Sequence, residues 1–416
     1  MAPREDGVTE LLRFPDDFLW GSGISAHQCE GGNRHNDWWA FEEQGKVAGG
    51  ERSGDACDHY TRYAEDFRLA ARLGHAVVKI SVEWSRIERE PGVFDEGELV
   101  HYEDVVRTMC DLGLRPIVAL HHFTNPLWLE EHGWWEGART PELFARFVRV
   151  VAERLGPWVD TWITINEPML VVSAGYKWGF WPPERRGWLS ARRAARNLVR
   201  AHNLAYDAVH DVAGICRVGP AVNVTALRPP GRPTIADRVL ASPLDWLANY
   251  YFMDRVRERA DFIGVQYYSR ATVQQLLAGD PLAVPKSARR LPRSDLGWEI
   301  YPKGIYYTVR SMWRRFGLPI IVTENGIADA EDCKRADFIK DHLAWLHRAI
   351  GEGADVRGYL HWALLDNFEW REGFAPRFGL VAVDYETQER VVRDSARLFA
   401  RICRDNAVPV PAKDVV

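Results

Sequence analysis

Eight short apolar runs alternate with longer amphipathic stretches, and this alternation constrains the fold more than any other feature of the chain. Apolar runs of about four to eight residues are typical of buried strands. Strands that alternate with helices indicate βα units and a parallel sheet. The runs are Phe18–Ser25, Ala76–Val82, Arg115–Leu120, Thr161–Ile165, Arg217–Val222, Asp261–Val265, Pro319–Thr323 and Arg357–Leu360.

Eight such units without a Pro/Ser-rich linker predict an α/β fold, a (β/α)8 TIM barrel that occupies residues 1–416 as a single domain. A hydrophobic content of 46% supplies enough apolar material for a core of that size. A doubly wound open sheet is the alternative, but no GxGxxG motif follows a strand to favour it. Two helices stand out: Ala64–Gly74 ends on a C-cap glycine, and Pro141–Leu155 follows Thr140 as its N-cap.

Polar and aromatic side chains follow every one of the eight runs. The active site of a (β/α)8 barrel lies at the carboxyl ends of its strands, so these side chains are expected to meet there. Amides, carboxylates, imidazoles and aromatic rings together suit a polyhydroxylated ligand, although any one of them could be a solvated strand end. In chain order they are Gln28 and Glu30; Trp84 and Arg86; His121 and His122; Asn166 and Glu167; Asn223; Gln266, Tyr267 and Tyr268; Glu324 and Asn325; and Trp362 with Asp366, Glu369 and Trp370.

Two carboxylates each end a buried run: Glu167 in Thr-Ile-Asn-Glu-Pro and Glu324 in Val-Thr-Glu-Asn-Gly. Paired carboxylates serve glycosidic bond cleavage, where one donates a proton and the other attacks the sugar or activates water. They also serve metal binding. The adjacent His121 and His122 point to opposite faces of a strand, however, which disfavours a histidine-rich metal site.

Charge and cysteine content exclude several other classes of protein. The net charge is −5 without a basic block, which argues against nucleic-acid binding. The charged segment Met1–Gly7 and the lack of a long apolar span predict a cytoplasmic protein that does not bind membranes. The six cysteines are scattered without a CxxC motif, so we expect reduced thiols and neither a disulfide framework nor a zinc site.

Three motifs in order carry a family resemblance: Thr-Ile-Asn-Glu-Pro, Val-Thr-Glu-Asn-Gly and the late His361–Trp370 segment, His-Trp-Ala-Leu-Leu-Asp-Asn-Phe-Glu-Trp. With Phe18–Gly31 and Arg377–Asp384, they make the chain resemble family 1 glycoside hydrolases over nearly its whole length. That family contains retaining β-glucosidases and β-galactosidases with a (β/α)8 barrel. The resemblance implies one catalytic domain, no cofactor or metal, and small β-glycosides or short oligosaccharides as substrates. A homo-oligomer is possible.

The resemblance implies an exo-β-glycosidase that releases terminal unphosphorylated β-D-glucosyl, galactosyl or fucosyl units by double displacement. Glu167 would be the acid/base and Glu324 the nucleophile. The implied substrate-binding residues are Gln28, His122, Asn166, Tyr268, Trp362, Glu369 and Trp370, and the implied supporting residues are Arg86, Asn223 and Phe378. A catalytically impaired sugar-binding barrel is the alternative function. An endo-acting glycanase of a related barrel family is disfavoured by the pocket-closing pair Glu369 and Trp370.

The chemistry of these roles leads to three expectations. The cation of Arg86 would favour the ionised form of Glu324. The negative charge of Glu324 would raise the pKa of Glu167, which keeps that side chain protonated at neutral pH. A retaining mechanism also requires the two carboxyl groups to lie about 5–5.5 Å apart.

The sequence departs from the family pattern in three places. His121-His122-Phe123-Thr124 stands where many members have Tyr-His-Trp-Asp. Gln266 replaces the usual Asn before the tyrosine pair, which is expected to alter contacts around Tyr268. The stretch Val224–Ala260 is short, which leaves the outer subsites open. Trp178, Phe180 and Trp181 follow the fourth strand and are equally consistent with stacking on an aglycone or with internal packing.

Overall fold

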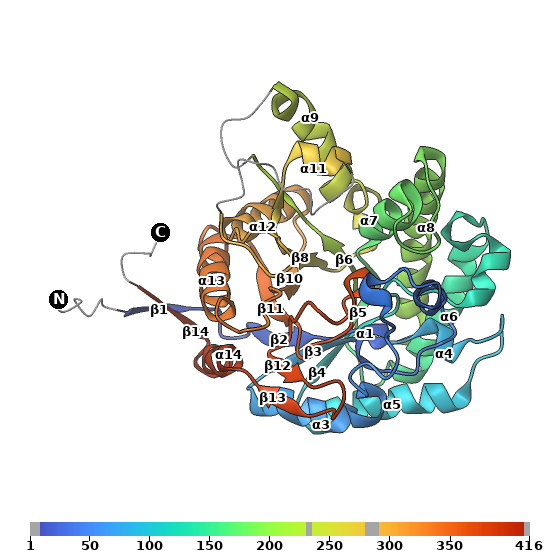
Figure 1. Ribbon diagram of the computed structural model, residues 1–416, viewed down its shortest axis with the longest axis horizontal. Coiled ribbons are helices and arrows are strands. Elements are labelled where there is room, and N and C mark those ends of the chain that lie inside the picture. The colour runs from blue at the N-terminus through green and yellow to red at the C-terminus, as the bar shows by residue number, and fades with distance from the viewer. Residues whose placement is uncertain (1–8, 230–234, 279–290, 412–416) are drawn as a thin grey trace.

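A closed barrel of eight parallel strands forms the centre of the computed structural model, which describes residues 9–229, 235–278 and 291–411 (Figure 1). The strands follow one another around the barrel in chain order, and β11 closes on β2. Each strand overlaps one of the eight predicted runs, so the (β/α)8 prediction is confirmed and the open-sheet alternative is wrong. The strands are β2 (Leu19–Gly23), β3 (Val77–Ser81), β4 (Arg115–Ala119), β5 (Thr161–Asn166), β6 (Arg217–Asn223), β8 (Ile263–Gln266), β10 (Ile320–Asn325) and β11 (Val356–Trp362).

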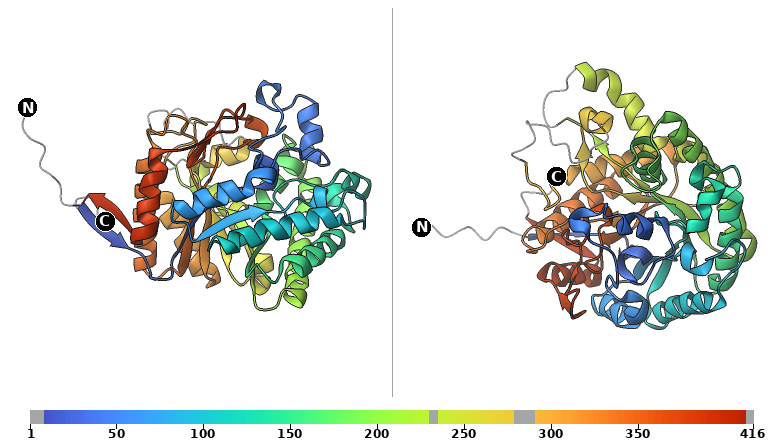
Figure 2. Two further views of the ribbon diagram at one scale, coloured as in Figure 1. Left: turned by 90° about the horizontal axis from the view of Figure 1, so that it is seen from below. Right: turned by 45° about the vertical axis from the view of Figure 1, so that its right-hand side comes forward.

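Helices cover the outside of the barrel in all three views (Figures 1 and 2). The two helices singled out from the sequence are α3 and α6. Thr140 is the first residue of α6 rather than its N-cap, and its hydroxyl donates to the main-chain carbonyl of Trp134 at 2.5 Å. Arg139 occupies the N-cap position without a side-chain hydrogen bond to the helix. The longer helices are α3 (His59–Arg72), α5 (Glu96–Asp111), α6 (Thr140–Leu155), α8 (Trp188–Val212), α9 (Ile235–Asp245), α12 (Lys303–Phe316), α13 (Arg335–Gly351) and α14 (Asp394–Asp405).

Shorter elements lie in the loops between strands and helices. The short α-helices are α1 (Ala26–Cys29), α2 (Asp37–Glu43), α4 (Trp84–Ile87), α7 (Pro168–Val171), α10 (Met253–Val256) and α11 (Val273–Ala278). The 3₁₀ segments are η1 (Ala48–Gly50), η2 (Leu127–His132), η3 (Trp134–Glu136), η6 (Arg257–Arg259) and η8 (Trp370–Glu372), and the π-helical segments are η4 (Val172–Trp178) and η5 (Trp246–Tyr250).

Three small sheets lie outside the barrel. Strands β1 (Thr9–Arg13) and β14 (Ala407–Pro411) pair antiparallel and so join the two ends of the described chain (Figure 1). The other pairs are β12 (Val381–Val383) with β13 (Arg390–Val392), and β7 (Ala226–Leu227) with β9 (Arg270–Ala271). Within the described ranges, no helix is both long and apolar enough to cross a membrane. The charged segment Met1–Gly7 lies outside those ranges.

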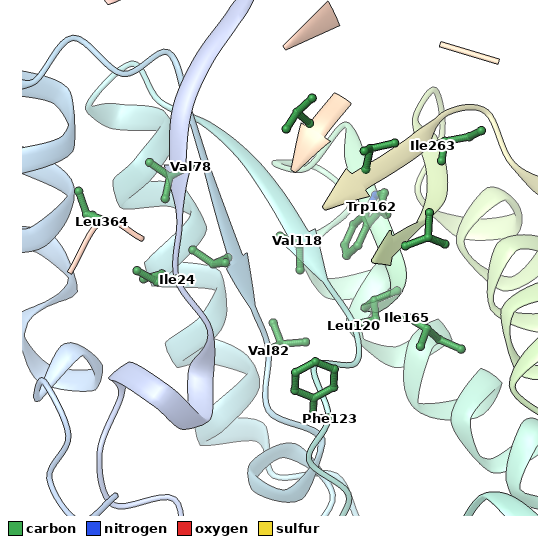
Figure 3. Packing of buried hydrophobic residues seen from close by; sticks show 14 of the residues in the cluster. Ile24, Val78, Val82, Val118, Leu120, Phe123, Trp162, Ile165, Ile263 and Leu364 are labelled. Atoms are coloured by element: carbon green, nitrogen blue, oxygen red, sulfur yellow. The ribbon is translucent and has the colours of Figure 1, made fainter. Parts of the chain in front are cut away.

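Alternation along the strands separates an inner from an outer apolar layer. Val77, Ile117, Ile163 and neighbouring residues fill the barrel interior. The residues next to them in sequence, such as Val118 and Trp162, belong to the larger cluster that packs the strands against the helices (Figure 3). This arrangement follows from the period of two residues in a strand. The rigid barrel therefore holds the side chains at its strand ends in fixed positions.

Candidate active site

A cavity of about 750 Å³ lies where the strands end, and most of the predicted site residues line it. Loops and short helices that follow six of the strands complete its wall. The predicted residues in the wall are Gln28, His122, Asn166, Glu167, Asn223, Tyr268, Glu324, Trp362, Glu369 and Trp370. Phe378 lies behind the wall, where its ring packs against that of Tyr268 with centroids 6.2 Å apart.

Glu324, at the end of β10, is surrounded by hydrogen-bond donors. The ammonium group of Lys79 contacts its Oε1 atom, and the amide Nε2 of Gln266 donates to the same oxygen at 2.6 Å. The Tyr268 hydroxyl donates to Oε2 at 2.5 Å. An ionised carboxylate can only accept hydrogen bonds, so this arrangement suits a carboxylate anion that is held in one orientation.

Arg86 does not contact Glu324, so that expectation was wrong. Arg86 lies in α4, beyond the end of β3, and donates through Nε to Glu30 at 2.9 Å and through a terminal nitrogen to the Gly31 carbonyl. The cation beside Glu324 is Lys79, which lies within β3 and is completely buried. The sequence did contain a signal, because Lys79 interrupts an apolar run at the spacing that places it on the interior face with Val77.

Glu167 has very different surroundings from Glu324. It follows β5 in a left-handed backbone conformation with φ of 47°, which is uncommon for residues other than glycine. Asn223 Nδ2 donates to its carboxyl group at 3.0 Å. Burial, and secondly the charge of Glu324, raise the pKa of Glu167 to about 8. Glu167 is therefore a neutral acid at pH 7, as expected, although burial rather than Glu324 is the larger cause.

Asn166 connects the two sides of the site. Its Oδ1 atom accepts from both Lys79 and Gln266, each at 2.7 Å, which leaves the amide nitrogen facing the imidazole of His122 at 3.4 Å. Burial, and then the charge of Lys79, hold the pKa of His122 well below its ordinary value. A neutral imidazole and an oriented amide are thus available to hydroxyl groups of a ligand.

Glu369 is a further acidic side chain in the cavity wall, besides Glu167 and Glu324. Gln28 Nε2 donates to Glu369 at 3.3 Å and to Asn367 at 3.0 Å. Burial, and then the charge of Glu324, raise the pKa of Glu369 to about 8. In the unliganded pocket at neutral pH, Glu369 is therefore a carboxylic acid that can donate as well as accept a hydrogen bond. The rings of Trp362 and Trp370 lie near parallel to that of His122 and 5.9 Å from it.

Comparison with known proteins places this geometry in a family. The family described as Glycosyl hydrolase family 1 matches residues 11–257 and 253–408. The chain belongs to glycosyl hydrolase family 1. The resemblance predicted from the three motifs is confirmed, and the protein is a β-glycosidase enzyme of this family.

Relatives of this family 1 enzyme match it almost end to end. Beta-glucosidase A of Thermotoga maritima is 32% identical, covering 96% of this chain and 99% of that protein. A beta-galactosidase of Sulfolobus acidocaldarius is 31% identical, with 96% of both chains covered. Among solved structures, a beta-glycosidase from Pyrococcus horikoshii is 38% identical and covers 96% of both chains with a TM-score of 0.87. The Thermotoga maritima beta-glucosidase in complex with glucoimidazole is 31% identical, covers 95% of this chain and 99% of that chain, and has a TM-score of 0.85.

Two departures from the family pattern acquire a structural explanation. The side-chain amide of Gln266 donates to both Glu324 and Asn166. The longer side chain that stands in place of the usual Asn therefore makes direct contacts in the pocket. His121 and His122 do point in opposite directions, as predicted. His121 packs against Trp135 in the outer layer, whereas His122 lines the cavity. Part of the short stretch Val224–Ala260, residues 230–234, lies outside the described residues.

The aromatic loop after β5 lies at the cavity of this family 1 enzyme. Trp178, Phe180 and Trp181 all line it, and Trp181 also packs edge-on against Trp38. Sequence reasoning missed the aliphatic part of the same wall, which comes from α7, α9, η5 and α11: Met169, Leu170, Leu244, Leu247, Leu276 and Leu277. Leu244, Leu247, Leu276 and Leu277 lie well beyond the strand ends, whereas Met169 and Leu170 closely follow Glu167. No motif marks any of them as wall residues.

Proposed function

We propose that this β-glycosidase is a retaining exo-enzyme that releases terminal unphosphorylated β-D-glucosyl, galactosyl or fucosyl units. Glu324 is the nucleophile and Glu167 the acid/base. The observation that carries the proposal is the contrast between the two carboxyl groups of one pocket. Three donors face Glu324, whereas burial raises the pKa of Glu167 to about 8. Pairs of carboxyl groups with opposed environments are the usual basis for separate acid and nucleophile roles.

The first half of the reaction forms a glycosyl ester. Glu324 attacks the anomeric carbon while Glu167 transfers its proton to the leaving oxygen, and the glycosidic C–O bond breaks. The charge on Glu324 disappears in the ester, so the second-largest cause of the raised pKa of Glu167 is removed. The charge of Lys79 remains and lowers that pKa further. Glu167 then acts as a base on a water molecule, which attacks the anomeric carbon and regenerates Glu324.

The other wall residues bind the sugar in this proposal. Glu369 and Gln28 face its hydroxyls at the closed end, Asn166 and His122 bind nearer the anomeric carbon, and Trp362 and Trp370 supply stacking faces. A 6-phosphate at Glu369 would meet an ionisable carboxyl group. At neutral pH the protonated Glu369 offers a buried phosphate no compensating cation. Its ionised form, above about pH 8, would add one unit of like charge, which costs roughly 4 kcal/mol at about 4 Å with an effective dielectric constant near 20. Unphosphorylated substrates are therefore favoured. The alternative function, a catalytically impaired sugar-binding barrel, is disfavoured because both catalytic carboxyl groups are present.

A panel of nitrophenyl β-glycosides tests this function. The glucoside, galactoside and fucoside are compared with the glucoside 6-phosphate, and proton NMR identifies the anomer that is released first. We expect cleavage of at least one neutral glycoside, poor cleavage of the phosphate, and initial release of the β-anomer. Initial release of the α-anomer would show inversion and exclude the double displacement.

A further inference from the structure

Beyond the two carboxyl groups, much of the cavity wall is apolar, although Arg192 and Gln275 also line the cavity. Met169 of α7, Leu244 of α9, Leu247 of η5 and Leu276 of α11 form aliphatic wall there, together with Trp178. Helices α9 and α11 lie side by side at this part of the molecule (Figure 1). The polar carboxyl end and the apolar region belong to one continuous space, so a ligand bound at Glu167 extends into the apolar region.

Several polar groups in this region are already engaged within the protein. The Ser173 hydroxyl donates to the Leu170 carbonyl at 3.1 Å. The Asn249 amide donates to the carbonyl of Thr225 and to Asp245, and its oxygen accepts from the Thr225 main chain. A second sugar unit would bring several hydroxyl groups that lose water on binding. Hydroxyl groups that lose water without gaining a partner weaken binding, so this wall suits an apolar group better.

Large apolar side chains also lie at the rim of the same region. Trp188 is 65% exposed, and Leu277 is 49% exposed, although both line the cavity. The ammonium group of Lys177 lies over the ring of Trp188, 4.0 Å from its centroid, and over that of Trp178 at 4.5 Å. The positive charge of Lys177 therefore makes cation–π contacts with these two rings. An apolar ligand chain that passes Leu247 and Leu276 would therefore next meet the apolar side chains of Leu277 and Trp188 at the mouth of the cavity.

We propose that the aglycone site of this enzyme binds a linear alkyl chain, so that long-chain alkyl β-glycosides are better substrates than disaccharides. This inference rests on the proposed function, because it takes the sugar to be bound between Glu369 and the catalytic pair. The substrate is then amphipathic: its sugar occupies the hydrogen-bonding end of the cavity, and its chain occupies the apolar region.

A homologous series of alkyl β-glucosides tests the inference. Methyl, butyl and octyl glucosides release alcohols of similar acidity, so differences in kcat/KM report contacts of the chain rather than leaving-group chemistry. All are assayed below their critical micelle concentrations. Full burial is worth about three- to fourfold in affinity per methylene group. Allowing for partial exposure at the rim, we expect kcat/KM for octyl glucoside to exceed that for butyl glucoside by about tenfold or more, and to exceed that for cellobiose.

Substitutions in the apolar wall test whether the dependence of kcat/KM on chain length arises there. Leu247→Asn places an amide in the apolar wall and should reduce the octyl-to-methyl ratio of kcat/KM several-fold. Leu189→Asn makes the same chemical change at a side chain that is 72% exposed and does not line the cavity, so it should keep the wild-type ratio. Leu276→Asn provides a second wall variant, and circular dichroism confirms that each variant is folded.

Each outcome of the series has a distinct meaning. If nitrophenyl glucoside is cleaved but kcat/KM does not rise with chain length, the alkyl site is wrong and the proposed function stands. If cellobiose exceeds octyl glucoside, the region is a sugar subsite instead. If no β-glycoside is cleaved at all, the proposed function fails and the alkyl site fails with it. An equal octyl-to-methyl ratio in Leu247→Asn and wild type would also overturn the assignment.

Discussion

Glu167 and Glu324 are chemically identical side chains that the protein makes different through their neighbours. Glu324 meets Lys79, Gln266 and Tyr268, whereas Glu167 is buried with one amide donor. Burial without strong donors stabilises the protonated form, and converging donors suit an anion. The proposed division of acid and nucleophile roles therefore depends on neighbouring residues from other parts of the chain.

Replacement of Glu167 by Ala should affect substrates according to their leaving groups. An alkyl glucoside needs a proton on its leaving oxygen, so its cleavage should fall by about 10²–10⁴-fold. Formation of the glycosyl-enzyme from dinitrophenyl glucoside needs little acid assistance and should fall far less. Pre-steady-state release of dinitrophenol measures this step. Equal losses on both substrates would indicate a damaged fold or a wrongly assigned residue.

Lys79→Met should move the pH dependence of the reaction. The charge of Lys79 lowers the pKa of Glu167, so its removal raises that pKa above about 8. In the proposed mechanism activity requires protonated Glu167 and is lost as pH rises through its pKa, so the basic limb of kcat/KM should shift to higher pH. Lys79→Arg keeps the charge and serves as the matched control. A basic limb that stays in place in Lys79→Met would show that this charge does not act on Glu167.

The ends of strands β5 and β10 explain why both carboxyl groups reach the cavity. The pairing of β10 with β8 shifts register between Val322 and Glu324, and that of β5 with β6 shifts between Ile163 and Asn166. Such irregularities redirect the side chains that follow them. Gly326 follows β10 directly, and only glycine fits at this position. A Cβ atom there would lie 1.9 Å from the main-chain oxygen of Trp362.

Gly326→Ala should therefore destabilise the fold and displace Glu324. The clash is with main chain, which cannot rotate away, and overpacking of this kind costs about 1–3 kcal/mol of unfolding free energy or more. Gly351→Ala in α13 is the control, because no atom lies within 4 Å of its added Cβ. Urea unfolding of the two variants provides the comparison. If Gly326→Ala were as stable as Gly351→Ala, the close approach of β10 and β11 would not be a constraint.

Most of the barrel could be predicted because its signals are local. Each strand is a short apolar run, and each proposed catalytic carboxyl group lies at the end of such a run. The contacts of Lys79 and Arg86 could not be predicted in the same way. Lys79 lies 245 residues from Glu324 in sequence, and which cation reaches Glu324 depends on strand register and side-chain direction. The aliphatic part of the cavity wall was missed for a related reason, because the helices that form it are brought together only by the folding of the whole barrel.

Buried carboxyl groups make the stability of the complete fold depend on pH. Glu167 and Glu369 each have a pKa of about 8 in the folded protein, against about 4.3 for an unperturbed glutamate. Between these values the folded state holds protons that the unfolded state has released. The contribution of these two groups to the free energy of unfolding therefore falls as pH rises from about 4.3 to about 8.

Glu167→Gln removes one of these titrating groups while keeping its shape. The unfolding temperature of Glu167→Gln should exceed that of the wild type by more at pH 8.5 than at pH 5. At pH 8.5 the wild type carries a buried charge at Glu167 that the variant lacks. Glu131→Gln, at an exposed position, should show no such widening. Thermal unfolding followed by circular dichroism at the two pH values measures the difference. A constant gap would contradict the raised pKa of Glu167.

The assignment of Glu324 as nucleophile is tested most directly by Glu324→Gly with added azide. The variant should be nearly inactive because no other group is placed to form the glycosyl ester. Azide should enter the space left by the side chain and attack the anomeric carbon of a nitrophenyl β-glucoside from the face that Glu324 used. We predict restored turnover with α-glucosyl azide as the product, identified by NMR. A β-glucosyl azide product would contradict the assignment of Glu324 and the double displacement built on it.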